Sequence, residues 1–144
     1  MSVARVLVVS SLLCLGVAVS LSGQQPPAAS QSAKVSGNIE HGRYLVENVV
    51  MCYECHSTRD PQGNIIPGTR FRGGPMPMRP SWSTDWPIQI PRIAGLPGYT
   101  DEQAMRLLTQ GAIRRDGTQL RYPMPRFHMN PQDAADVIAY IRSL

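Results

Sequence analysis

The chain has 144 residues, 17% of them charged, and a formal net charge of +4 at pH 7, with one lysine and scattered arginines. This length excludes a second core of ordinary size, and no basic tract is dense enough to predict nucleic-acid binding. Beyond residue 22, Leu, Ile, Val and Phe provide only 22 of 122 residues against 24 for Pro and Gly, so a group other than side chains is expected to complete the core.

The first 22 residues have the pattern of a secretory signal peptide. Arg5 precedes an uncharged apolar run over residues 6–19, and small residues follow it. This order is typical of an export signal, and the run is short for a membrane span. We expect cleavage after Ser20 or Ser22, a periplasmic or otherwise exported product, and no membrane span after cleavage. The alternative is an uncleaved segment that tethers the protein to the membrane.

A polar, proline-containing stretch over residues 23–37 is typical of a flexible leader. Residues 38–144 are expected to form the folded domain. Apolar residues recur there at helical spacing and predict a first helix that runs into Cys52. The β-branched Val49 and Val50 near its end would also tolerate a strand.

Proline and glycine are frequent over residues 57–98, and only short apolar runs separate them. No regular element of useful length is predicted there. Compact domains rarely carry structureless connections of this length, so we expect this segment to wrap around a ligand.

Two further helices are predicted from their capping residues. Thr100 and Gln103 form a capping box that starts a short amphipathic helix ending near Gly111. Asn130 caps the last helix, which has Pro at its first position and an apolar face to the end of the chain. Asp133 and Asp136 are interpreted as first-turn charges of this helix rather than as a catalytic carboxylate pair. The elements predict an all-α fold.

Residues 52–56 read Cys-Tyr-Glu-Cys-His, the C-x-x-C-H pattern to which c-type haems are attached. Two cysteines three residues apart on a helical turn face the same way, so each sulfur can bond one vinyl-derived carbon of the same porphyrin. The adjacent histidine can then bring a ring nitrogen to the iron as proximal ligand. Cys52, Cys55 and His56 are therefore the candidate binding residues for one haem per chain.

Three other interpretations of the cysteine pair are less favoured. A thioredoxin-like redox pair follows a strand of an α/β sheet, and no such sheet is predicted. A zinc site needs about four ligands, and the chain beyond residue 22 has two Cys and three His without a second paired motif. A structural disulfide is the simplest alternative. The export signal, the helical approach and the adjacent histidine favour haem.

A methionine is expected on the opposite side of the iron, since His and Met are the usual ligands of an electron-transfer haem of this class. Met124 is preferred because prolines on both sides fix its backbone and the last helix follows directly. Met76 and Met78, in a second Pro-Met-Pro stretch, are the next candidates. The less favoured candidates are Met129, His41 and His128, and both histidines are better explained as surface or hydrogen-bonded residues.

Three segments resemble the small class I type bacterial cytochromes c, especially single-haem domains similar to cytochrome subunits of periplasmic dehydrogenases. They are HGRYLVENVVMCYECHS, YTDEQAMRLLTQGAIRRDG and YPMPRFHMNPQDAADVIAYIRSL. The resemblance implies a cytochrome c fold of three to four helices and long loops around one covalently bound haem. It implies a close crossing of Gly42 against Tyr140, with Met124 as axial ligand. It also implies a proline carbonyl that orients His56, for which Pro67 is the best positional match.

Residues 71–91 depart from the smallest members of that family because they are longer and more irregular, which keeps Met76 and Met78 open as ligands. A lysine-rich docking face is absent. The expected function is that of a periplasmic single-electron carrier, not an enzyme, whose partners are redox proteins such as a dehydrogenase, an oxidase or a respiratory complex. The alternatives are a haem enzyme or gas-sensing module with an open sixth position, or a cytochrome subunit of a larger dehydrogenase.

Overall fold

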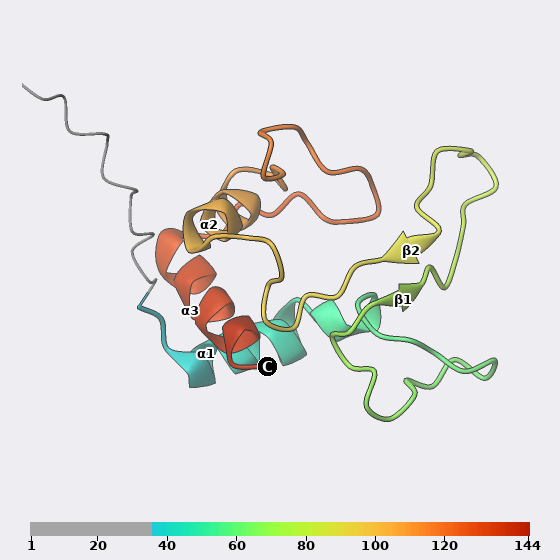
Figure 1. Ribbon diagram of the computed structural model, residues 1–144, viewed down its shortest axis with the longest axis horizontal. Helices are drawn as coiled ribbons and strands as arrows, with labels where there is room; N and C mark the ends of the chain where they lie inside the picture. The colour runs from blue at the N-terminus through green and yellow to red at the C-terminus, as the bar shows by residue number, and fades with distance from the viewer. Residues whose placement is uncertain (1–35) are drawn as a thin grey trace, which may run out of the picture. The chain divides into compact units, whose positions relative to one another are not determined.

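A computed structural model of the chain describes residues 36–144. The predicted signal peptide lies outside this part, as does the predicted leader up to residue 35. Three α-helices joined by long loops make up the described part (Figure 1), and its only sheet has two strands of two residues each. The predicted all-α class is confirmed. No helix within residues 36–144 has the length and apolar character needed to span a bilayer.

The first helix, α1 (Ile39–Tyr44), does not continue into Cys52 as predicted. A π-helical turn over Leu45–Val49 follows it, and Met51 then adopts a left-handed φ of 52° before a 3₁₀ turn over Cys52–Glu54. Two consecutive β-branched valines close the π-helical turn, and such residues crowd the preceding turn of an α-helix. Because of this break, the turn that carries the cysteines is a separate element and does not continue α1.

Helices α2 and α3 start where the sequence predicts. Helix α2 (Asp101–Thr109) has the expected capping box, in which the Gln103 amide donates to the Thr100 hydroxyl at 3.2 Å and the Thr100 amide donates to the Gln103 side chain at 2.9 Å. Helix α3 (Pro131–Arg142) follows Asn130, whose side chain accepts a hydrogen bond from a first-turn amide at 2.8 Å. Local capping chemistry thus sets both helix starts.

The long segment between the attachment motif and α2 contains one small hairpin. Strands β1 (Gly74–Pro75) and β2 (Gln89–Ile90) pair antiparallel, with Gly74 opposite Ile90. We call the residues between them, 76–88, the hairpin loop; Figure 1 shows it projecting away from the three helices. The rest of residues 57–98 forms no named element, as predicted.

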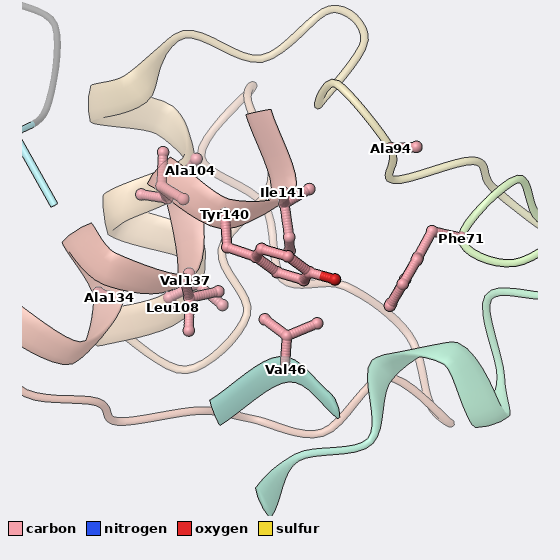
Figure 2. Close-up of a cluster of buried hydrophobic side chains, with 10 residues drawn as sticks. Val46, Phe71, Ala94, Ala104, Leu108, Ala134, Val137, Tyr140 and Ile141 are labelled. Carbon is pink, nitrogen blue, oxygen red and sulfur yellow. The ribbon is translucent and has the colours of Figure 1, made fainter. Parts of the chain in front are cut away.

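The apolar core packs between α2, α3 and the π-helical turn after α1, and it is thin. Figure 2 shows Val46 and Tyr140 facing each other near its centre, with Phe71 on the loop beside them. Five of the thirteen buried apolar residues in the described part are alanines. Small side chains bury little area, so the core agrees with the shortage of large apolar residues noted in the composition.

Gly42 is the point at which α1 crosses α3. A Cβ atom added there would lie 1.9 Å from the carbonyl oxygen of Asp136 and 2.9 Å from the Cβ of Tyr140. The predicted approach of Gly42 to Tyr140 is therefore confirmed. Only glycine permits backbone contact this close.

Replacing Gly42 by Ala is expected to lower the free energy of unfolding by more than about 3 kcal/mol, because the steric clash with α3 exceeds the gain of about 1 kcal/mol in helix propensity. The midpoint of thermal unfolding should fall by about 10 °C or more. Glu40→Ala is the control, since Glu40 is exposed on the same helix. A Gly42→Ala protein that melts within a few degrees of this control would contradict the close crossing.

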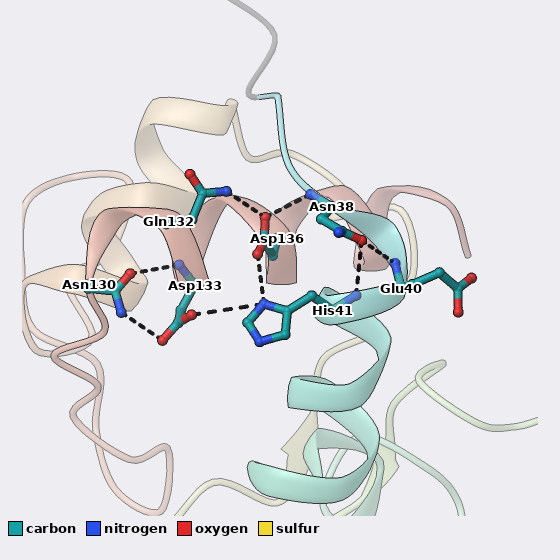
Figure 3. Close-up of polar contacts among 7 residues, drawn as sticks. All are labelled: Asn38, Glu40, His41, Asn130, Gln132, Asp133 and Asp136. Atoms are coloured by element: carbon teal, nitrogen blue, oxygen red, sulfur yellow. Dashed lines mark hydrogen bonds and ion pairs between the residues drawn. The ribbon is translucent and has the colours of Figure 1, made fainter.

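A polar network joins the start of α1 to α3 (Figure 3). The buried Asp136 accepts hydrogen bonds from the Asn38 amide at 2.7 Å and the Gln132 side chain at 2.8 Å, and its second oxygen lies 2.8 Å from Nδ1 of His41. The interpretation of Asp136 as a mere helix charge is wrong. Three donors offset the cost of burying its carboxylate. His41 is hydrogen-bonded, as expected.

Asp136→Asn is expected to cost about 1 to 3 kcal/mol at neutral pH, because an amide group replaces one of two accepting oxygens. Burial raises the pKa of Asp136, but the hydrogen bonds from Asn38, His41 and Gln132 outweigh it and hold the pKa below its ordinary value. Its contribution to stability is therefore complete above about pH 4 and is lost as the pH falls through the depressed pKa. Urea unfolding across this range should show a weaker acid dependence in the variant than in wild type or Asp133→Asn.

Candidate functional site

A cavity of about 670 Å³ lies beside the attachment motif. Ala104 and Leu108 of α2 line it together with Val137 and Ile138 of α3. The attachment motif, the segment before α2 and the loop between α2 and α3 supply most of the remaining lining. Its size falls in the range of cofactor sites, and its lining is mostly apolar. Of the segment expected to wrap a ligand, only residues 76–97 contribute to the lining. Residues 57–75 do not line it.

Cys52 and Cys55 both line this cavity, and their thiols are free. Burial, together with a smaller effect of the nearby Cys55, raises the pKa of Cys52 to about 11. A redox-active dithiol instead requires a thiolate with a lowered pKa. The motif also follows a π-helical turn rather than a strand. These features disfavour a thioredoxin-like pair and leave two thiols directed at an apolar site.

His56 is 7% exposed and its Nδ1 lies 2.8 Å from the carbonyl oxygen of Pro91. Because a carbonyl can only accept, Nδ1 carries the proton and Nε2 keeps its lone pair for a metal ion. Burial lowers the pKa of His56, and the Pro91 carbonyl only partly opposes this. The ring is therefore neutral at pH 7, the state that a metal ligand needs.

The identification of Pro67 as the orienting proline is wrong, since Pro91 fills that role. The segment after His56 forms a loop closed by hydrogen bonds. The Thr58 amide donates to the Thr69 hydroxyl, and the Ile66 amide donates to the Thr58 carbonyl. This closure leaves Pro67 exposed at a turn. The chain returns to the His56 backbone at Gly73, whose amide donates to the His56 carbonyl at 3.0 Å, but it reaches the His56 ring only at Pro91, after the hairpin loop. Sequence distance from the motif therefore gives no guide to the contact with the ring.

Met124 reaches the cavity from the loop between α2 and α3. The base of that loop is closed by backbone hydrogen bonds from Gly111 to Phe127 at 2.8 Å and from Met129 to Leu108 at 3.0 Å. The closed base and the prolines beside Met124 restrain its backbone. The structure therefore brings Met124 into the same cavity as the attachment motif.

The other ligand candidates divide into two groups. Met76 and Met129 also line the cavity, so they stay candidates by position. Met78, His41 and His128 are not among the lining residues, and Met78 is 71% exposed.

Arginines form a feature of the site that the sequence analysis missed. Arg114 lines the cavity and its buried Nε has no hydrogen-bond partner among the described residues. Arg92, Arg115 and Arg121 also line it. A buried guanidinium nitrogen is normally paired, and a carboxylate suits it. Haem carries carboxylates, so this residue fits the predicted cofactor. In the sequence, the adjacent pair Arg114 and Arg115 after α2 was the only pattern that could have indicated these cavity arginines.

Comparison with known proteins agrees with this geometry. The family model described as Cytochrome c matches residues 39–144. No curated protein matches the chain. The matched residues include all three helices, the attachment motif and the cavity lining. The protein thus belongs to the cytochrome c family and binds one c-type haem covalently through Cys52 and Cys55.

Proposed function

We propose that the protein is a single-electron carrier in which His56 and Met124 are the axial ligands of the haem iron. The observation that carries this proposal is that His56, with its free Nε2, and Met124, on a restrained loop, line one apolar cavity. When bound, the haem supplies a reversible one-electron change of its iron. Family members generally transfer electrons, which supports a carrier over an enzyme.

The residues around the cavity have three roles in this proposal. The Pro91 carbonyl fixes the His56 ring and makes Nε2 a stronger ligand. The thioether of Met124 favours the reduced iron and raises the reduction potential. Apolar residues of α2 and α3 exclude water, which lowers the local dielectric and limits reorganisation.

Location and partners form a further part of the proposal. We assign residues 1–22 as a cleaved signal peptide and place the mature protein in the periplasm. Members of the cytochrome c family are typically exported, which supports this location. The electron donors and acceptors are other redox proteins, namely a dehydrogenase, an oxidase or a respiratory complex. The protein serves them as a free carrier or as a subunit.

The test is expression together with periplasmic haem-ligation machinery. A haem stain after denaturing electrophoresis should remain on the chain, and potentiometric titration should show one reversible one-electron transition. The N-terminal sequence of the mature protein should begin after Ser20 or Ser22. An irreversible titration, or colour that leaves the chain on denaturation, would refute the carrier.

A further inference from the structure

Large apolar side chains of the hairpin loop are exposed to solvent. Trp82 is 79% exposed, Met78 71% and Ile88 69%. None of the three lines the cavity, so bound haem does not account for their exposure. Large exposed apolar side chains gathered on one loop are typical of interaction sites on soluble proteins.

The hairpin loop is held in a defined shape. The Trp86 indole donates to the Met78 carbonyl at 3.0 Å, and the Trp82 and Trp86 rings meet edge to face with centroids 5.9 Å apart. The Met76 amide donates to the Ile88 carbonyl at 3.0 Å. A surface ordered in this way loses little conformational entropy when a partner binds.

The hairpin loop also lies at the edge of the haem cavity. Met76 and Pro87, at its two ends, line the cavity. Asp85 pairs with Arg121, which lies in the loop that carries Met124. A molecule bound to the exposed tryptophan would therefore sit next to the site of electron exchange.

Charge is unevenly distributed around this edge. Segments 71–98 and 111–129, which border the cavity, contain seven arginines and two acidic residues. The rest of residues 36–144 contains five arginines and eight acidic residues. The net positive charge of the described residues thus lies in these two segments, the first of which contains the hairpin loop. Such a field attracts acidic surfaces and disfavours a second copy of the same face.

We propose that the hairpin loop docks a partner protein whose surface has an apolar patch surrounded by acidic residues. Trp82 is the main anchor, Met78 and Ile88 of the same loop add apolar contacts, and the arginines of the two segments steer the encounter. Trp, Met and Arg are enriched in protein interfaces, and Trp often carries much of the binding energy. This inference rests on the proposed function, because the docked partner is the electron donor or acceptor.

The test uses synthetic peptides as probes of the reduced holoprotein in NMR titrations that follow the indole N–H signals. One peptide has a leucine core flanked by glutamates. A second has lysines in place of the glutamates, and a third has serines in place of the leucines. Vesicles of anionic lipid form a further arm. The variants are Trp82→Ser and Ile88→Ser, with Ile39→Ser as matched control because Ile39 is an exposed isoleucine of α1.

Only the peptide with both glutamates and leucines should shift the indole signals of Trp82 and Trp86. Trp82→Ser should weaken its binding at least about tenfold and Ile88→Ser several-fold, while Ile39→Ser binds like wild type. The docking proposal would be overturned if no peptide bound, or if the serine peptide bound as well as the leucine peptide. It would also be overturned if Trp82→Ser bound as well as Ile39→Ser, or if only vesicles shifted the signals. A redox titration of the same sample separates the two claims: normal titration without peptide binding refutes docking alone, and failed titration refutes the carrier.

Discussion

A Cys52→Ala/Cys55→Ala variant that lacks haem is expected to lose its cooperative unfolding transition. The core of the described part is thin, and five of its thirteen buried apolar residues are alanines. Without haem, the apolar lining of the cavity of about 670 Å³ would lack packing partners, and the cost of such a loss grows with the volume left unfilled. Typical domains are stable by only about 5 to 15 kcal/mol. Entry of water reduces this cost but does not replace the missing apolar contacts.

Circular dichroism during heating provides the measurement. The haem-free variant should show a shallow, non-cooperative change, whereas the wild-type holoprotein should melt in one sharp transition. Met124→Ala is the control because it alters a cavity residue while keeping both attachment cysteines. A sharp transition in the haem-free variant would show that side chains alone complete the core.

Met124→Ala is expected to abolish the sulfur-to-iron absorption band of the oxidised holoprotein. Loss of the thioether should also lower the reduction potential by at least ~59 mV, which is a tenfold change in the equilibrium constant of one-electron exchange. Absorption spectra and potentiometry measure the two effects.

Met76→Ala is the matched control for Met124→Ala, because Met76 is the other Pro-Met-Pro methionine that lines the cavity. It should keep the sulfur-to-iron band and stay near the wild-type potential. A band that survives in Met124→Ala but disappears in Met76→Ala would move the axial ligand to the hairpin loop.

Local chemistry explains what could be predicted from the sequence. The starts of α2 and α3 depend on caps formed by Thr100 and Asn130, which act within one turn. The attachment motif is equally local, since residues 52–56 contain both cysteines and the histidine. The crossing at Gly42 came from the family resemblance rather than from the residues alone.

Long-range contacts explain what could not be predicted. Pro91 meets His56 only because the intervening chain closes on itself and then returns. In the sequence, Asp136 cannot be distinguished from an exposed helix charge, because the Asn38 amide that donates to it lies far away along the chain. The unpartnered Nε of Arg114 likewise becomes visible only when the cavity is formed.

The most direct test of a closed electron-transfer haem is exposure of the reduced wild-type holoprotein to carbon monoxide. We expect the absorption spectrum to stay unchanged at neutral pH, because in the proposed ligation Met124, which lines the apolar cavity, would fill the sixth position of the iron. A rapid spectral shift on addition of carbon monoxide would contradict this ligation and indicate an open haem of the kind found in enzymes and gas sensors.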